Sequence, residues 1–224
     1  MKALVLAAGR GERLRPLTDH TPKPLLCVRD KPLIVWQLEA LARAGVVDVV
    51  INLAHLGAQI EAALGTGSGL GLRLRYSHEP PGALEAAGGI RLALPLMDGA
   101  PFILANADVW TDFDFTTLPR EPRGLAHLVL VPNPDHHPTG DFCLEGTQVT
   151  LQGSQRLTYA GIAVYRPELF AGIEPGTRAP LAPLLRESIG LGVVEGVVFG
   201  GEWVDVGTQE RLELANQKAG ESVF

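Results

Sequence analysis

The sequence lacks the features that mark several large classes of protein. Its two cysteines, Cys27 and Cys143, are 116 positions apart and have no metal-ligand spacing, so we expect small buried residues of a reducing compartment and no disulfide. No apolar run approaches the ~20 residues that cross a bilayer. The apolar N-terminus lacks a complete signal peptide. We therefore expect a cytoplasmic protein without membrane contact.

Positive charge is also scarce. The 224 residues include 19 lysines and arginines against 25 aspartates and glutamates, a formal net charge of -6, which argues against a nucleic-acid partner because such binding depends on basic surface. Residues 1–31 are the exception, with seven basic and three acidic side chains, and Lys23 is one of only four lysines in the chain. This basic start on an acidic chain indicates a local anion site, although a solvated basic face is the alternative.

The first half of the chain alternates strand and helix patterns. Apolar residues make up 46% of the sequence, which is typical of a globular protein. Strands are predicted at 2–7, 46–52, 72–76 and 102–106, with helices at 32–44, 56–64 and 84–94. This order favours right-handed crossovers and a mostly parallel sheet with a Rossmann-like α/β fold.

The second half is richer in strands. We expect strands at 125–131, 158–165, 193–199 and 202–206, a hairpin at 142–151 that turns at Glu145-Gly146, and a helix at 208–218. We find no linker, internal repeat or low-complexity segment. The expectation is a single α/β domain over residues 1–224, with an inserted, more antiparallel portion in its second half.

A glycine-containing turn follows the first strand. Because Gly9 and Gly11 have no Cβ, the backbone amides of this turn can approach phosphate oxygens closely. The spacing matches neither a dinucleotide fingerprint nor a P-loop, since Leu14 stands where the former needs its third glycine. A dinucleotide site and a P-loop NTPase are therefore disfavoured.

Longer motifs surround this turn. Residues 6–18 read Leu-Ala-Ala-Gly-Arg-Gly-Glu-Arg-Leu-Arg-Pro-Leu-Thr, and residues 21–25 read Thr-Pro-Lys-Pro-Leu. Together they resemble the signature of sugar-1-phosphate nucleotidyltransferases, and residues 106–110 and 203–208 resemble the two segments that carry the metal carboxylates in that family. The resemblance implies a nucleotide-diphospho-sugar transferase fold, with a nucleotide-binding part at about 1–110 and an antiparallel sugar-binding part at about 111–205.

Finer details are most similar to the N-acetylmuramate-1-phosphate uridylyltransferases of cell-wall recycling. These details are Gly-Glu-Arg at 11–13, the segment 84–90, Gly-Asp-Phe at 140–142 and the compact length. The chain departs from that pattern with Ala86 and Ala87 in place of Thr-Gly, and with Ala107 in place of a glycine. The expected acceptor is N-acetylmuramate 1-phosphate. The resemblance at residues 84–90, which is to pyrimidine-binding relatives, implies UTP as the nucleotide, with dTTP tolerated. A purine would need more room beside Gly88, and Ala87 slightly narrows that space.

The resemblance assigns the nucleotide and metal contacts. It makes Arg13 and Lys23 catalytic, because a guanidinium fork and a compact ammonium suit phosphate groups. Asp108 and Asp205 are hard oxygen ligands suited to a shared Mg²⁺. The nucleotide-binding set is Ala8, Gly9, Gly11, Glu12, Arg13, Lys23, Glu85 and Gly88. Glu85 has helix N-terminal capping as an equal alternative, and Lys23 is expected in an exposed turn.

The sugar-side assignments are less specific. The resemblance makes Asn106, Gly140, Asp141, Tyr159 and Gly161 candidates for sugar contact. Asn106 could instead only end its strand, and Gly161 could serve packing alone. A zinc site is an alternative use of the His-His pair at 136–137, but no second ligand pair accompanies it, which favours a polar loop.

These assignments predict a Mg²⁺-dependent enzyme that converts an NTP and a sugar 1-phosphate into an NDP-sugar and pyrophosphate. It would work as a monomer or small homo-oligomer. The alternatives are a hexose- or heptose-1-phosphate guanylyl- or thymidylyltransferase, a phosphocholine-type cytidylyltransferase, and a non-catalytic sensor of nucleotide sugars. A sensor has no need for Arg13, Lys23, Asp108 and Asp205 together.

Overall fold

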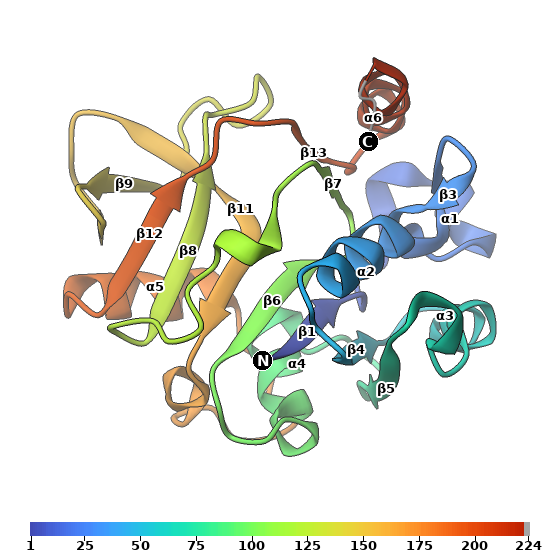
Figure 1. The fold of residues 1–224 in the computed structure, drawn as a ribbon, viewed down its shortest axis with the longest axis horizontal. Coiled ribbons are helices and arrows are strands. Elements are labelled where there is room, and N and C mark those ends of the chain that lie inside the picture. Colours follow the sequence, from blue (N-terminus) through green and yellow to red (C-terminus); the bar gives the residue numbers. More distant parts are fainter. Residues whose placement is uncertain (222–224) are drawn as a thin grey trace.

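The computed structural model describes residues 1–221, and the last three residues of the predicted domain 1–224 lie outside the described part. A nine-stranded sheet forms the centre of the molecule, in the order β5-β4-β1-β6-β11-β8-β12-β10-β9 (Figure 1). The parallel first half comprises β1 (Lys2–Leu6), β4 (Asp48–Leu53), β5 (Arg73–His78) and β6 (Phe102–Asn106). These strands confirm the predicted α/β fold.

Helices cover both faces of the parallel strands. α2 (Leu33–Arg43) and α3 (Gly57–Leu64) pack through Leu38 and Ile60 against Val5 and its neighbours on one face. α4 (Glu85–Ala93) packs through Ile90 on the other face, beside Leu4. Burial of both faces explains the continuous apolar runs of these strands, since a parallel strand has no side that faces water.

The second half adds antiparallel strands, as predicted. Its strands are β8 (Ala126–Val131), β9 (Phe142–Glu145), β10 (Gln148–Thr150), β11 (Arg156–Tyr165) and β12 (Val194–Val198). β11 runs antiparallel to both β6 and β8, so it joins the two halves of the sheet, whereas β12 is parallel to β8. β9 and β10 form the predicted hairpin.

One helix of this half was not predicted. α5 (Leu181–Gly190) begins after Pro180 and buries Leu185 and Ile189 against the sheet. These two buried apolar residues are four positions apart, which is helical spacing, but two such positions are a weak signal. Pro180 precedes the first turn, where a proline favours a helix start because no backbone donor is lost there.

Short elements outside the large sheet bring the two ends of the chain together. β7 (Val109–Thr111) pairs antiparallel with β13 (Trp203–Asp205), and β2 (Cys27–Val28) pairs with β3 (Lys31–Pro32). α1 (Leu17–His20) and α6 (Gln209–Glu221) complete this region, and α6 lies above β13 in the view of Figure 1. A separate apolar core that includes Leu14, Val28, Trp110 and Ala215 holds the region together.

Six short 3-10 helices connect these elements. They are Glu12–Leu14, Lys23–Leu25, Ser68–Leu70, Leu94–Leu96, Phe115–Thr117 and Pro167–Phe170. The first two belong to the signature motif. They turn the chain so that both Gly11 and Lys23 face the end of β1.

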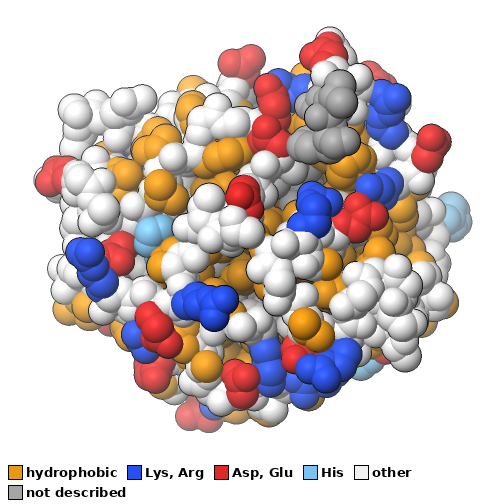
Figure 2. Space-filling model, in the orientation of Figure 1, with side chains coloured by type: hydrophobic (Ala, Val, Ile, Leu, Met, Phe, Trp, Pro, Cys, Tyr) orange, Lys and Arg blue, Asp and Glu red, His pale blue; other side chains and the backbone are white. Residues whose placement is uncertain are grey.

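The surface agrees with the composition of the chain. Acidic and basic side chains are intermixed over the face drawn in Figure 2. Across residues 1–221, none of the helices has the length and hydrophobicity that a membrane crossing requires. Both cysteines are free thiols, but only Cys143 is buried. The expected burial of Cys27 is wrong, because this residue lies on the two-residue strand β2, where its side chain faces solvent.

Candidate active site

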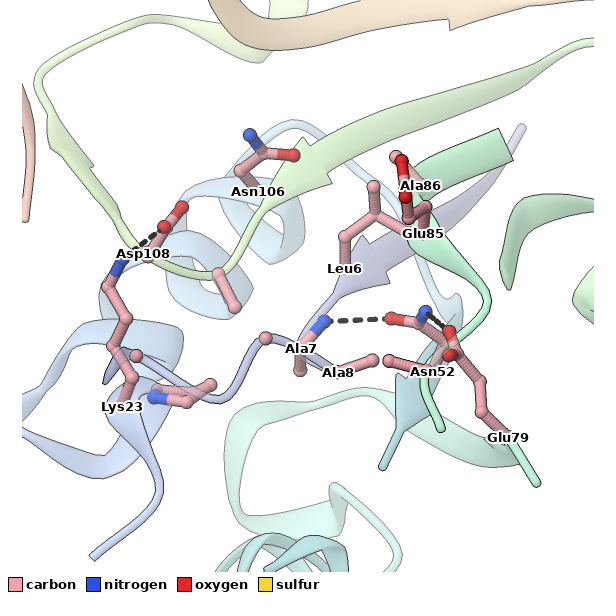
Figure 3. Close-up of a pocket in the computed structure, with 15 residues that line it drawn as sticks. Leu6, Ala7, Ala8, Lys23, Asn52, Glu79, Glu85, Ala86, Asn106 and Asp108 are labelled. Carbon is pink, nitrogen blue, oxygen red and sulfur yellow. Dashed lines mark hydrogen bonds and ion pairs between the residues drawn. The ribbon is translucent and has the colours of Figure 1, made fainter. Parts of the chain in front are cut away.

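A cavity of about 260 Å³ opens at the carboxyl ends of β1, β4 and β6 (Figure 3). We call it the first cavity. Its walls are mostly small or apolar: Leu6, Ala7, Ala8, Gly9, Gly11, Lys23, Pro24, Asn52, Glu79, Ala83, Glu85, Ala86, Asn106, Ala107 and Asp108. Ligand sites of open parallel sheets form at this edge, because the turns after the strands meet there. Seven predicted site residues line it: Ala8, Gly9, Gly11, Lys23, Glu85, Asn106 and Asp108.

A hydrogen-bonded chain supports the floor of the first cavity. The amide of Asn52 accepts from the backbone N–H of Ala7 at 2.8 Å and donates to Glu79 at 2.6 Å (Figure 3). The other oxygen of Glu79 accepts from the backbone N–H of Leu84 at 2.8 Å. A Cβ on Gly89 would lie 2.3 Å from Glu79 Oε1, so a glycine is needed for this close approach.

Neither Asn52 nor Glu79 was predicted as a site residue. Asn52 is the last residue of the predicted strand at 46–52 and is 2% exposed. An amide at the end of a buried strand needs a hydrogen-bond partner, and that need was the available signal. Glu79 follows β5 in a loop, and its sequence neighbours do not indicate where it points.

The start of α4 is strained and lies at the mouth of the first cavity. Ala83 and Glu85 have φ values of 49° and 58°, a region that non-glycine residues rarely adopt and that is often found at functional sites. Glu85 forms an ion pair with Arg178 at 2.7 Å. It is also the first residue of α4, where the helix dipole favours a negative charge, so helix capping stands as an alternative beside the predicted nucleotide contact.

Gly88 and Ala87 face away from the first cavity. A Cβ on Gly88 would lie 2.4 Å from the carbonyl oxygen of Thr177, so this glycine admits the backbone of the 177–179 segment. Ala87 is fully buried in the core, and it is Ala86 that lines the cavity. The expected narrowing of the base pocket by Ala87 is therefore wrong, because its place on α4 turns its methyl group inward.

Lys23 is buried rather than exposed. Its 8% exposure contradicts the expected turn at the surface. Residues 23–25 form a 3-10 helix that turns the lysine inward, and its side chain packs against Gly11, where a Cβ would lie 3.2 Å from Lys23 Cβ. The ammonium group donates to Asp108 in a short ion pair (Figure 3). The structure thus joins two predicted site residues that are 85 positions apart.

A second cavity of about 320 Å³ adjoins the first and shares Asn106 and Asp108 with it. Its other lining residues are Arg13, Val109, His136, His137, Thr158, Tyr159, Ala160, Gly161, Trp203, Asp205 and Arg211. Gly161 has a φ of 72°, and a Cβ there would lie 2.4 Å from Asn106 Nδ2. Gly161 therefore makes room for Asn106 at the boundary between the two cavities.

Two aspartates line the second cavity beside the β7–β13 pair. Asp205 is the last residue of β13, and Asp108 immediately precedes β7. Asp205 lies opposite Val109 in that strand pair, and the backbone N–H of Val206 donates to the carbonyl of Asp108 at 2.8 Å. Asp205 also forms an ion pair with Arg211 at 2.5 Å. His136 Nε2 lies 2.9 Å from the other oxygen of Asp205. The carboxylate is therefore held by Arg211, and His136 lies beside both groups.

The pair Gly140 and Asp141 shapes the loop beside the second cavity without lining it. Gly140 has a φ of 58°, and a Cβ there would lie 2.6 Å from Asn133 Oδ1. Asp141 accepts from the backbone N–H of Tyr159 at 2.9 Å and lies 3.1 Å from His137 Nε2. Their predicted contact with the sugar remains a prediction.

Two more predicted residues have particular surroundings. The hydroxyl of Tyr159 lies 3.0 Å from that of Tyr165, and burial raises the pKa of Tyr159 well above its usual value. Glu12 is exposed and lines a third cavity of about 510 Å³ together with Arg10 and His55. Arg13 is exposed and reaches the second cavity, 3.0 Å from the position that a Cβ on Gly207 would occupy.

The donor set suits magnesium rather than zinc. Asp108 and Asp205 supply carboxylate oxygens to one cavity, and Mg²⁺ typically takes one or two carboxylates together with substrate phosphates. Within residues 1–221, no three His, Cys, Asp or Glu side chains lie close enough to hold a metal by themselves. His136 and His137 contact Asp205 and Asp141 separately. The histidine pair thus belongs to a polar loop, the reading that the spacing favours.

Comparison with known proteins identifies the family. Residues 2–142 match the nucleotidyl transferase family. The chain is 52% identical to N-acetylmuramate alpha-1-phosphate uridylyltransferase from Neisseria meningitidis serogroup B, over 98% of this chain and 99% of the relative. It is 32% identical to the enzyme of the same name from Caulobacter vibrioides, over 98% and 97%.

A solved structure shares the fold. It is assigned as a glucose-1-phosphate thymidylyltransferase from Bacillus anthracis, and it superposes with a TM-score of 0.88 at 22% identity, covering 100% of this chain and 97% of that one. The resemblance seen in the signature motifs is confirmed. The chain belongs to the nucleotidyl transferase family, with the nucleotide-diphospho-sugar transferase fold.

Proposed function

We propose that the protein transfers a uridylyl group from UTP to N-acetylmuramate 1-phosphate, giving UDP-N-acetylmuramate and pyrophosphate. The observation that carries this proposal is the 52% identity to the Neisseria meningitidis uridylyltransferase along nearly the whole of both chains. The ion pair of the buried Lys23 with the half-buried Asp108, which lines both cavities, supports the reaction class, because both substrates have phosphate groups that must meet there.

The first cavity suits the nucleotide. Its alanine and glycine walls admit a flat base, and the backbone amides at Gly9 to Gly11 are available to phosphate oxygens. Asn106 stands between this cavity and the second, where a ribose or sugar hydroxyl could accept or donate a hydrogen bond. The second cavity suits the sugar phosphate. We therefore assign UTP to the first cavity and the acceptor to the second.

Nucleotidyl transfer needs no covalent protein intermediate. An oxygen of the sugar phosphate attacks the α-phosphorus of UTP, and the bond from that phosphorus to the pyrophosphate oxygen breaks. The protein contributes by holding the reactants in line and by neutralising charge. Lys23 supplies a desolvated positive charge at the boundary of the cavities, and Arg13 supplies a guanidinium fork from the N-terminal loop.

We propose that Asp108 and Asp205 hold one Mg²⁺ together with substrate phosphates. When bound, the ion neutralises phosphate charge and orients the phosphoryl oxygens. In the structure each carboxylate already has a cationic partner, Lys23 for Asp108 and Arg211 for Asp205.

A pyrophosphate-release assay over a panel of substrates tests the function. The panel combines UTP, dTTP, CTP and GTP with N-acetylmuramate 1-phosphate, N-acetylglucosamine 1-phosphate and mannose 1-phosphate. We expect the highest kcat/KM for UTP with N-acetylmuramate 1-phosphate, some activity with dTTP, and a strict need for Mg²⁺. A clear preference for GTP with mannose 1-phosphate would replace this assignment by a guanylyltransferase, and a preference for CTP by a cytidylyltransferase.

The absence of any pyrophosphate release, together with tight binding of a UDP-sugar, would favour the sensor alternative. The resemblance also supports a role in cell-wall recycling and a cytoplasmic location. Light scattering of the purified protein distinguishes the expected monomer or small homo-oligomer from larger assemblies.

A further inference from the structure

Arg211 occupies an unusual position in the wall of the second cavity. It lies on α6, is 8% exposed, and uses Nη1 for its contact with Asp205. Its other terminal nitrogen, Nη2, lies 2.0 Å from the position that a Cβ on Gly207 would occupy. A side chain at position 207 would therefore displace this guanidinium. Gly207, in the Asp-Val-Gly motif, therefore leaves the space that the Arg211 side chain needs to reach the second cavity.

A second guanidinium lies close by. Nη2 of Arg13 is 3.0 Å from the same Gly207 position, so Nη2 of Arg13 and Nη2 of Arg211 are at most about 5 Å apart. Like charges at this range repel unless an anion joins them. The ion pairs of the described residues include one for Arg211 but none for Arg13. The arrangement therefore has capacity for anionic groups of a ligand.

The two arginines of the second cavity, Arg13 and Arg211, face two aspartates there, Asp108 and Asp205. Of the two guanidinium groups, only that of Arg211 has an ion pair with these aspartates. Arg211 lines the second cavity and not the first, and its polar neighbour His136 comes from the 132–140 loop, with Nε2 at 2.6 Å from Arg211 Nη1. This pair therefore stands on the side of the acceptor sugar, away from the nucleotide.

We propose that Arg211, assisted by His136, binds the carboxylate of the acceptor sugar and so selects an acidic sugar 1-phosphate over neutral ones. This inference rests on the proposed function. N-acetylmuramate differs from N-acetylglucosamine by a lactyl ether that ends in a carboxylate. A guanidinium fork matches a carboxylate in geometry and charge, and the surrounding burial strengthens such a contact. Arg211 is thus a specificity-determining residue.

Two other roles compete with this one. Arg211 could bind phosphate oxygens together with Arg13, or it could only hold Asp205 in place. Both roles affect every acceptor sugar equally, because every acceptor carries the same phosphate and uses the same Asp205. Only recognition of the carboxylate produces an effect that depends on that group. The experiment therefore compares two acceptors that differ at that group alone.

The two acceptors are N-acetylmuramate 1-phosphate and its carboxamide, in which the lactyl carboxylate is replaced by a neutral amide. The kcat/KM of each is measured with UTP. We expect the wild-type protein to prefer the acid by about 30-fold, since hydrogen bonds to charged groups are about that selective. Arg211→Met should reduce the preference to within about 3-fold, and His136→Gln should reduce it partly. Arg186→Met on α5, an exposed arginine outside both cavities, should leave it unchanged.

Two outcomes overturn the inference while the proposed function stands. One is a wild-type protein that uses both acceptors equally well, a result that does not depend on any variant folding. The other is an Arg211→Met protein whose two kcat/KM values fall by the same factor, which would assign Arg211 to the phosphates or to Asp205. If the wild-type protein uses neither acceptor but does use a neutral hexose 1-phosphate, the proposed function and this inference fail together.

Discussion

The two cavities differ in how their walls are built. In the first, Asn52 and Glu79 bind each other and backbone N–H groups, so the wall offers ligands mainly small side chains and amides. In the second, Asp205, Arg211 and His136 lie together and bring formal charge to the wall. Shape and amides suit a flat, neutral base, whereas charges suit a phosphorylated, acidic sugar. The two halves of this sheet edge therefore differ in their walls: small side chains and hydrogen-bonded amides form much of the first, and an aspartate, arginine and histidine cluster lies in the second.

Asn106 and Asp108 belong to both halves. They lie at the end of β6 and in the turn after it, with Lys23 on one side and Gly161 on the other. Substitutions here should disturb both substrates, and substitutions deeper in either cavity should disturb only one. We therefore expect substitutions at the shared boundary to reduce activity more than substitutions deeper in either cavity.

Replacement of the carboxylates should have the largest effect. We expect Asp108→Asn and Asp205→Asn each to lower kcat by about 10³-fold and to raise the Mg²⁺ concentration needed for half-maximal rate. Steady-state rates over a Mg²⁺ titration measure both quantities. Asp98→Asn, at an exposed carboxylate paired with Lys2, is the matched control and should behave as wild type. A near-normal rate for Asp205→Asn would remove it from the metal site.

Loss of Lys23 should come next and should affect both activity and stability. Lys23→Ala removes a charge aimed at the reacting phosphates, which is commonly worth about 10²–10³-fold in kcat. Because Lys23 is buried and pairs with Asp108, we also expect the free energy of unfolding to fall by about 1–3 kcal/mol. Rates and urea unfolding measure the two effects. Lys31→Ala, at a more exposed lysine paired with Glu39, should change neither by much.

A methyl group at Gly89 should affect the first cavity alone. Gly89→Ala places a Cβ against Glu79 and Asn52, so we expect the KM for UTP to rise about 10-fold while the KM for the sugar phosphate stays within about 2-fold. Gly88→Ala is the matched comparison, because its Cβ meets the Thr177 backbone instead. We expect this substitution to lower the melting temperature with little change in the KM for UTP. Equal effects of both substitutions on the two KM values would contradict the division into two cavities.

The smallest expected effect is a pH dependence of stability in the second half. Burial lowers the pKa of His127 on β8 below its usual 6.5, against the opposing charge of Glu195. The unfolded chain then binds a proton more readily than the folded protein, so stability decreases as pH falls below about 6.5. Urea unfolding at pH 7.5 and pH 5.5 should show a smaller loss for His127→Gln than for wild type. An unchanged loss would exclude His127 as its source.

The alternating strands and helices of the first half could be predicted from the sequence, because each has a regular apolar pattern. The parallel strands and their helices were found because burial on both faces makes each strand a continuous apolar run. α5 and β7 were missed, since α5 has only two buried apolar positions at helical spacing and β7 is three residues long. A short strand has no period of its own. Its pairing with β13 depends on contacts 91 positions away, such as that of Thr111 with Glu202.

The site residues that belong to the signature motifs could be predicted from the sequence. The signature residues Gly9, Gly11, Lys23 and Asp108 all line the first cavity. What the motif could not give is the environment of each residue. Lys23 is followed by a proline and was assigned to an exposed turn, but a partner 85 positions away draws it inside. Glu79, Arg211 and His136 belong to no motif, and only the folded chain shows which cavity they reach.

The small β7–β13 pair forms a separate ribbon beside the second cavity. Three residue pairs join these strands, and they lie outside the nine-stranded sheet. Gln37 holds β7 from α2, and Trp203 holds β13 through the carbonyl of Ala160. Separating this ribbon would leave the nine-stranded sheet paired, so we expect it to require a local rather than a global unfolding free energy. Amide hydrogen exchange should therefore be faster at Val204 and Trp110 than at Leu4 and Leu104, whose strands cannot separate without unfolding the sheet.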